Sequence, residues 1–245
     1  MATYKGTKGF TVQILSSDPT SESTVGLLFF NSTDNEFKYV APGGAISLGT
    51  WASGGNINTA RRAMSSSGSS QNAGLIFGGT IAPQVANTES YNGTSWSEVN
   101  DLNTARSAAN LGVSGTQTSA IMASGETPNR NEAETWDGTN WTNVGNINSG
   151  RYSSMGLATS NTSGLICGGE PPPGTFSVNT EVWDGSSWTE VNNLNTARNR
   201  GAGVGTVTDG IVCGGQISPP NGPSTVTELW NGTSWTEVAD TNAGT

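Results

Sequence analysis

Histidine is absent from this 245-residue chain, charge is sparse, and cysteine occurs only twice. Without histidine the chain lacks the commonest general base and metal ligand. That absence excludes a Ser-His-Asp triad, a Cys-His arrangement and a thiol–imidazole zinc site. Charged residues make up 12% of the chain and sum to −9. Because phosphate binding requires a basic surface, this balance argues against nucleic acid as a partner. We expect no metal, no cofactor and no enzymatic activity.

Long hydrophobic runs are also missing. No stretch approaches the roughly 20 consecutive apolar residues of a membrane span, and residues 1–10 lack the apolar core of a secretory signal. Only 33% of the residues are hydrophobic, but they gather in short runs among 34 glycines and many Ser, Thr and Asn. That composition is typical of an all-β protein with frequent tight turns.

Tryptophan, by contrast, recurs at a regular spacing. One series of tryptophans lies 45, 45, 47 and 47 residues apart: Trp51, Trp96, Trp141, Trp188 and Trp235. A second aromatic residue stands five positions before each later member: Tyr91, Trp136, Trp183 and Trp230. A period in this range indicates a propeller, a solenoid or an array in which each copy is one supersecondary unit.

Each copy of the repeat predicts four strands. It begins at an Asn-Thr-Ala-Arg turn or its equivalent, whose arginine falls ten residues after a tryptophan: Arg61, Arg106, Arg151 and Arg198. A strand of small residues follows, which suits the innermost strand of a radial blade. An apolar strand ending in Gly-Gly comes next, except that the second copy has Ser124-Gly125. Asn-Gly or Asp-Gly then joins the third and fourth strands as a hairpin, because both dipeptides tolerate positive φ.

The two cysteines fall at one position of this repeat. Cys167 and Cys213 precede Gly-Gly, where the other copies carry Phe77 and Ala123. A position that accepts all three residue types is an apolar packing site. We therefore interpret both thiols as structural, rather than as a disulfide or as reactive nucleophiles.

A glutamate stands two residues before the third-strand aromatic in every copy: Glu89, Glu134, Glu181 and Glu228. Residues two apart on a strand share a face, and neighbouring blades cover both faces of a propeller blade. These carboxylates should therefore be partly buried, and a buried charge needs a partner. Each copy also has one repeat arginine, at the same spacing along the chain as the glutamates. We therefore hypothesise Glu–Arg pairing within or between adjacent units. Solvated strand faces are the alternative.

This order of features resembles the kelch repeat, with its arginine, strand of small residues, Gly-Gly, third-strand aromatic and fourth-strand tryptophan. The resemblance covers residues 50–245 in four registered copies. It implies an all-β fold in which residues 46–245 form a kelch-like β-propeller of four complete four-stranded blades. It implies no activity, because the family includes binding modules, scaffolds and a few enzymes. Its copper oxidases need histidine ligands, which this chain lacks.

The first fifty residues admit two interpretations. Residues 26–40 comprise an apolar segment, a polar turn and an alternating segment, in which Phe30 and Phe37 loosely echo the aromatic pair of the repeat hairpin. Together with a strand at Trp51 they would form a degenerate, partial fifth blade, which we favour. Alternatively, residues 1–45 form a separate attachment hairpin beside a four-bladed ring.

Residues 10–62 resemble the N-terminal segment of tailed-phage structural proteins, notably those of marine phages. The matching segments are residues 12–19, residues 26–33, Phe37-Lys38 and the junction of Trp51-Ala52-Ser53-Gly54-Gly55-Asn56 with the first Asn-Thr-Ala-Arg turn. This chain has Phe29 and Phe30 where those proteins usually carry Trp or Tyr. The resemblance implies a virion component on the tail or capsid surface. It would attach to other virion proteins through residues 1–45 and assemble as a homo-oligomer.

The segment between the second and third strands varies from copy to copy, at residues 80–87, 126–131, 170–176 and 216–223. We expect these loops to gather on one face of the ring, where their prolines would lower the entropy lost on binding. The candidate binding residues are Ile81, Pro83, Arg130, Pro172, Phe176, Ile217 and Pro220. Of these, we expect Arg130, Phe176 and Ile217 to be exposed contact residues. Drift of unconstrained loops would explain the variation equally well.

Three functions fit these features. The first is a non-enzymatic phage structural protein, either a tail fibre or tail-associated protein or a capsid-surface protein, whose loop face binds a host-surface glycan or protein. The second is a cellular kelch adaptor for a peptide, which would favour a basic channel rim and a fused partner domain, neither of which the sequence shows. The third, a carbohydrate-active enzyme, needs a carboxylate pair on the loop face, for which only Glu126 and Glu170 qualify.

Overall fold

The computed structural model describes residues 13–17, 28–41, 44–47, 53–107, 114–126, 131–217 and 222–241. Within these residues the chain is all-β and its strands form several sheets of three or four strands. The chain divides into two compact units, residues 1–53 and 54–245. The described residues include no helix long and apolar enough to cross a membrane.

The N-terminal unit contains one sheet with the strand order β1-β2-β3-β4. Its strands are β1 (Gln13–Leu15), β2 (Leu28–Asn31), β3 (Glu36–Ala41) and β4 (Gly44–Ser47). The hairpin expected around Phe30 and Phe37 is present, with these two residues paired across β2 and β3 and their ring centroids 5.1 Å apart. Strand β1 pairs with β2 in parallel, which distinguishes this sheet from the antiparallel repeat sheets. Trp51 lies outside the described residues.

The C-terminal unit is built from four successive antiparallel sheets, one for each copy of the repeat. The first sheet comprises β5 (Ser65–Ser70), β6 (Ala73–Phe77), β7 (Thr88–Tyr91) and β8 (Trp96–Val99). The second comprises β9 (Ala120–Ala123), β10 (Ala133–Trp136) and β11 (Trp141–Val144). The third comprises β12 (Met155–Ser160), β13 (Ser163–Cys167), β14 (Thr180–Trp183) and β15 (Trp188–Val191). The fourth comprises β17 (Ala202–Gly205), β18 (Gly210–Cys213), β21 (Thr227–Trp230) and β22 (Trp235–Val238).

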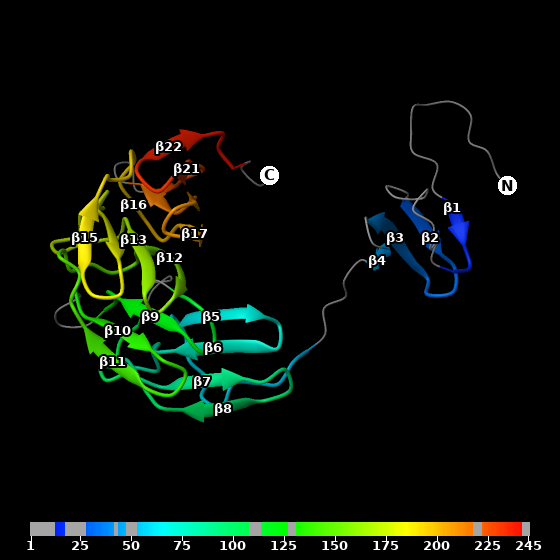
Figure 1. Cartoon of the computed structure of the whole chain (residues 1–245), viewed down its shortest axis with the longest axis horizontal. Coiled ribbons are helices and arrows are strands. Elements are labelled where there is room, and N and C mark those ends of the chain that lie inside the picture. The colour runs from blue at the N-terminus through cyan, green and yellow to red at the C-terminus, as the bar shows by residue number, and fades with distance from the viewer. Residues whose placement is uncertain are drawn as a thin grey trace. The chain divides into compact units, whose positions relative to one another are not determined.

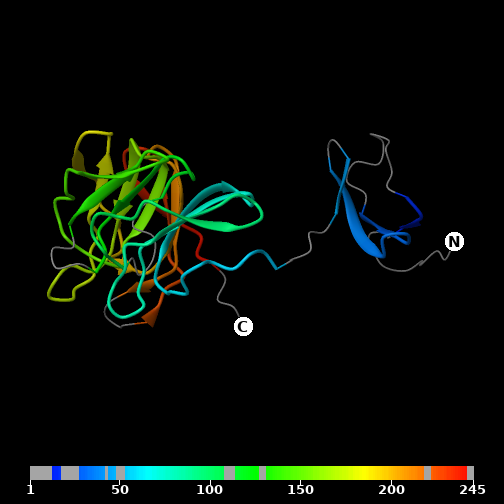
Figure 2. The same cartoon turned by 90° about the horizontal axis from the view of Figure 1, so that it is seen from below.

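Within each of these four repeat sheets the strands pair in chain order and antiparallel, so each is a meander. Residues 108–113, where the sequence predicts the first strand of the second copy, lie outside the described residues. A small additional sheet, which the repeat pattern does not predict, joins β16 (Arg198–Asn199), β19 (Gln216–Ile217) and β20 (Gly222–Pro223). In the C-terminal unit the four sheets follow one another along an arc, with β12 lying against β9 and β17 toward the inside and β8, β11, β15 and β22 outside (Figures 1 and 2).

Each repeat sheet has two faces, which we name by their place along the chain. The leading face carries the aromatic pair of the third and fourth strands, and the trailing face is the opposite one. Leading-face tryptophans pack on the trailing face of the preceding sheet: Trp136 and Trp141 on Leu75 and Phe77, Trp183 and Trp188 on Ile121 and Ala123, Trp230 and Trp235 on Leu165 and Cys167. These six indoles are only 2–7% exposed. Burial of each contributes on the order of 4 kcal/mol before entropy losses, so the tryptophans hold the sheets together.

The Gly-Gly pairs of the first and third copies lie against the arginine that begins the following copy. Gly78 has a φ of 64°, and a Cβ there would come within 2.6 Å of the Arg106 carbonyl oxygen in the next copy. In the second copy Ser124 occupies this position with a φ of 69°. An L-residue in the left-handed region costs roughly 1 kcal/mol. Ser124 therefore replaces the first glycine of the pair at the cost of backbone strain, while the backbone keeps the same conformation.

Candidate functional site

The repeat arginines and glutamates form four buried ion pairs, one in each copy. Arg106 Nη2 lies 2.6 Å from Glu134 Oε1, and Arg151 Nη1 lies 2.7 Å from Glu181 Oε1. The other two pairs are Arg61 with Glu89 and Arg198 with Glu228. All eight side chains have no exposed area. The pairing hypothesised from the sequence is therefore present, and each pair lies within a single copy.

The second carboxylate oxygen of each pair binds the turn that begins the copy. Glu134 Oε2 accepts hydrogen bonds from the backbone N and the Nδ2 of Asn103, at 2.7 and 3.0 Å. The same contacts join Asn148 to Glu181 and Asn195 to Glu228. In this way a carboxylate on the third strand fixes both the Asn-Thr-Ala-Arg turn and its arginine. Every described partner of these carboxylates is structural, which leaves no oxygen directed at a substrate.

The pKa of Glu89 reflects this environment. Burial raises the pKa of the carboxyl, but the Arg61 guanidinium and the backbone amides of Asn58 and Thr59 outweigh burial, so that the pKa falls below the ordinary value of 4.5. Glu89 is thus held as a carboxylate, the form that the turn requires. A group with these partners and a lowered pKa is unsuited to proton donation near neutral pH.

The aspartates of the third-to-fourth-strand hairpins are turn residues. Asp137 Oδ1 accepts hydrogen bonds from the amides of Thr139 and Asn140 at 2.8 and 2.7 Å. The corresponding amide of Ser187, with the hydroxyl and amide of Ser186, lowers the pKa of Asp184 to about 2. These contacts close the tight turn, as the Asp-Gly hairpin predicts.

The loops between second and third strands supply the candidate binding residues, and the structure separates them into two groups. Ile81, Pro83 and Pro172 are exposed, as a contact residue should be. Phe176 and Ile217, which we expected to be exposed, are half-buried instead. Ile217 pairs with Arg198 in the small sheet of β16, β19 and β20, so its backbone is committed to the fold. Arg130 and Pro220 lie outside the described residues.

The two carboxylates considered as a catalytic pair are attached to the scaffold in the same manner. Glu126 Oε2 accepts a hydrogen bond from the Ser107 hydroxyl at 3.2 Å, and Glu170 Oε2 accepts one from Asn199 Nδ2 at 2.9 Å. Glu126 thus ties its loop to the segment that begins its own copy, whereas Glu170 ties its loop to the segment that begins the next copy. Neither glutamate reaches toward the other through any described hydrogen bond.

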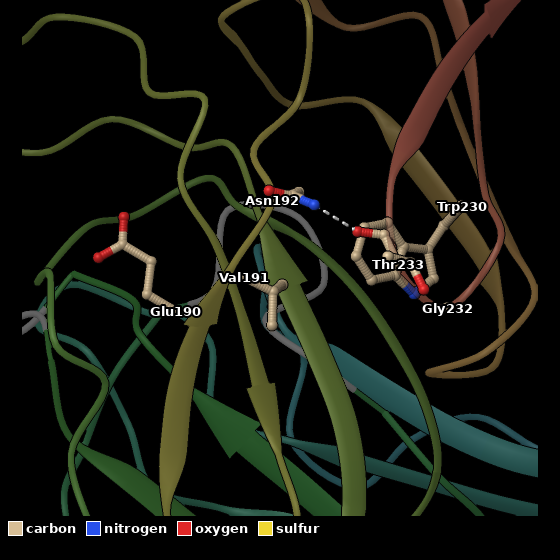
Figure 3. Close-up of a pocket in the computed structure, with 6 residues that line it drawn as sticks. All are labelled: Glu190, Val191, Asn192, Trp230, Gly232 and Thr233. Carbon is tan, nitrogen blue, oxygen red and sulfur yellow. Dashed lines mark hydrogen bonds between the residues drawn. The ribbon is translucent and has the colours of Figure 1, made fainter.

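A pocket of about 620 Å³ lies between the third and fourth sheets. Figure 3 shows its lining: Glu190, Val191, Asn192, Trp230, Gly232 and Thr233. Asn192 Nδ2 donates a hydrogen bond to the Thr233 carbonyl oxygen at 2.9 Å, so the two sheets are bridged at this point. Asn100 makes the same bridge to Thr139 in the first interface. The pocket therefore belongs to a repeated junction between sheets.

Sequence reasoning missed one recurring contact. Trp141 Nε1 donates to Thr88 Oγ1 at 3.0 Å, and Trp235 Nε1 donates to Thr180 Oγ1 at 3.1 Å. Each bond crosses from the outer strand of one sheet to the third strand of the preceding sheet. The signal was available, because threonine occupies this column in three of the four copies and Ala133 in the other.

No protein-family model matches the chain, and no curated protein is significantly similar to it.

Proposed function

We propose that this chain is a non-enzymatic structural protein of a tailed-phage virion. Residues 1–45 attach it to the particle, on the tail or the capsid surface, and residues 46–245 form a kelch-like β-propeller that displays its second-to-third-strand loops. Four meander sheets joined by leading-face tryptophans are what kelch-like blades require. The N-terminal hairpin between Phe30 and Phe37 supports the phage assignment.

The observation that carries this proposal is the division between a constant frame and variable loops. The buried Arg–Glu pair recurs in each copy and the tryptophan packing at each of three interfaces, whereas the loops at residues 80–87 and 170–176 differ in length and sequence. Loops that vary on a rigid scaffold are typical of binding proteins. We infer that the ligand is a host-surface glycan or protein, and that Ile81, Pro83 and Pro172 are the exposed contacts.

The virion assignment is tested by mass spectrometry of purified particles of the phage that encodes the chain. We expect its peptides at a stoichiometry comparable with that of other structural proteins. Their absence from particles that remain infectious would rule out the assignment, whatever the loops bind.

Loop binding is tested separately with a glycan array and with intact host cells. The intact chain is compared with a variant in which residues 80–84 and 171–175 are replaced by short Gly-Ser turns. We expect binding to be lost in the loop variant while thermal unfolding remains cooperative. Equal binding by both proteins would show that these loops do not recognise the host.

A further inference from the structure

The trailing face of the fourth sheet has the residues of an inter-sheet interface, but no described sheet covers it. Val204 is 68% exposed, whereas Leu157, its equivalent in the third sheet, is 2% exposed. Leu229 is 41% exposed at the position that Val182 occupies in the third sheet, where Val182 packs against the core. Apolar strand faces normally pack on another element. The fourth sheet therefore keeps the apolar residues of the repeat on its trailing face, although no other described sheet packs on that face.

The leading face of the first sheet is the matching half of such an interface. Tyr91 and Trp96 stand where the other copies carry their tryptophan pair, and their ring centroids are 5.0 Å apart, compared with 5.2–5.5 Å in the other copies. Both residues are half-buried, whereas the six equivalent tryptophans are 2–7% exposed. Among the described residues of 54–245, no sheet packs on this aromatic pair.

Backbone hydrogen bonds are incomplete at the same two ends. At each of the three interfaces a glycine amide donates to the arginine carbonyl of the following copy: Gly79 to Arg106, Gly125 to Arg151 and Gly169 to Arg198, at 2.9, 3.3 and 2.9 Å. In the fourth copy the equivalent donor is the Gly215 amide, and in the first copy the equivalent acceptor is the Arg61 carbonyl. Neither group has a hydrogen-bond partner within the described part of the chain. One end therefore offers the donor that the other end lacks.

We propose that the trailing face of the fourth sheet binds the leading face of the first sheet of a second copy of this chain, head to tail. Tyr91 and Trp96 of the second copy cover Val204 and Leu229, as Trp230 and Trp235 cover the third sheet. The Gly215 amide donates to the Arg61 carbonyl of that copy. This contact is a fourth repetition of an interface that the chain already builds three times, and it does not depend on the virion assignment.

The indole of Trp96 also finds its acceptor in this arrangement. In the single chain Trp96 Nε1 donates to the Gly55 carbonyl oxygen at 3.1 Å. In the assembly it donates instead to Thr227 Oγ1, which occupies the column of Thr88 and Thr180. Because the two contacting faces differ, the contact is heterologous. Copies therefore add in one direction, and the ring of blades proposed above is completed by more than one chain if the rotation closes.

The first test measures the mass of the assembly by sedimentation velocity over a hundredfold range of protein concentration. We expect the full-length chain to form species larger than the monomer, and Val204→Asp/Leu229→Asp to remain monomeric at every concentration. Both substituted positions are exposed, so this variant should keep its thermal transition. Leu28→Asp is the matched control, because Leu28 is 39% exposed but lies in the N-terminal unit, and it should assemble like the unmodified chain. A monomeric unmodified chain, or an undiminished double variant, would refute the proposal.

A mixing experiment tests whether the contact joins head to tail. Trp96→Ala removes the leading face and should also be monomeric alone. Mixed one to one, Trp96→Ala and Val204→Asp/Leu229→Asp retain one intact pair of faces, so we expect dimers and nothing larger. If Trp96→Ala alone still dimerises, trailing faces bind each other and the head-to-tail arrangement is wrong. Near-ultraviolet circular dichroism checks that the Trp96 variant is folded, and Tyr91→Ala replaces it if it is not.

Cys213 provides a probe that needs no substitution in the interface. It is half-buried on the trailing face, whereas Cys167 at the same position in the third sheet is fully buried by the fourth sheet. Docking of a second copy should bury Cys213 in the same way. We expect its rate of alkylation by iodoacetamide to fall at least about tenfold between dilute and concentrated protein. A rate that is independent of concentration would contradict the proposal.

Discussion

At the scale of single residues, one substitution in the repeat leaves an unsatisfied buried donor. Trp188 Nε1 has no hydrogen-bond partner among the described residues, whereas Trp141 and Trp235 donate to Thr88 and Thr180. The reason is that Ala133 occupies the position of the threonine acceptor. The register is the same in all three sheets, because Ala133, Thr88 and Thr180 each pair with a valine on the neighbouring strand. A buried N–H without a partner forfeits roughly 1–3 kcal/mol.

Ala133→Thr should therefore stabilise the protein. The hydroxyl would accept from Trp188 Nε1 in the geometry already present in two other interfaces, and we expect a gain of about 1 kcal/mol in the free energy of unfolding. Urea denaturation monitored by tryptophan fluorescence measures the change. Ala133→Val is the matched control, since it adds similar volume without an acceptor. Equal stability of the threonine and valine variants would show that the hydroxyl makes no bond.

Acid should weaken the turn that Glu89 holds. The pKa of Glu89 is lower in the folded chain than the ordinary value of 4.5, so the unfolded chain binds more protons as the pH falls. This contribution is complete above about pH 4.5 and is lost as the pH falls through the folded-state pKa. We expect the free energy of unfolding to decline below pH 4.5. In Glu89→Gln, which has no carboxyl to titrate at this site, the decline should be shallower; an unchanged slope would exclude the link.

At the scale of an element, the Arg–Glu pair makes a strand and a turn into one unit. The repeat predicted the Asn-Thr-Ala-Arg turn, the Gly-Gly strand end and the hairpin, because each depends on local backbone preferences. It did not predict β16, β19 and β20, since Ile217 pairs with Arg198 only after the loop folds back on the beginning of its own copy. The half-buried state of Phe176 and Ile217 has the same origin. The sequence of a loop shows that it varies between copies, whereas the solvent exposure of its side chains depends on the tertiary contacts that the loop makes.

Breaking one ion pair should destabilise its sheet strongly. In Glu134→Gln the buried Arg106 guanidinium keeps its charge but loses the buried carboxylate that lies 2.6 Å from it, and we expect a loss of about 3 kcal/mol in chemical denaturation. The matched control is Glu132→Gln, because Glu132 Oε2 is 3.6 Å from the same guanidinium and the Glu132 side chain is 28% exposed. A partly exposed pair contributes about 1 kcal/mol or less. Similar losses in both variants would argue against a special role for the buried pair.

At the scale of the whole molecule, the chain consists of two compact units. Residues 54–245 contain all three tryptophan interfaces and all four Arg–Glu pairs. The N-terminal sheet has its own pairing, including the parallel strand β1. The proposed phage attachment through residues 1–45 requires this kind of independence, because an attached segment and a displayed unit must each keep their structure.

Residues 54–245 expressed alone should fold. We expect the fragment to retain the near-ultraviolet circular dichroism of its packed tryptophans and to unfold within about 5 °C of the corresponding transition in the full chain, since its contacts are internal. Calorimetry of both proteins makes the comparison. A fragment without a cooperative transition would mean that residues 1–53 complete its core.

The sequence by itself determined the repeat: its period, its strand order, its turns and the pairing of each arginine with a glutamate. These features depend on residues within one copy, where spacing along the chain sets distance in space. Only the tertiary structure decided what happens between copies. The Trp–Thr bonds, the gap that Ala133 leaves, and the uncovered faces at Val204 and Tyr91 depend on which sheet lies against which. A repeat pattern is the same at the ends of an array as in its middle, and burial distinguishes them.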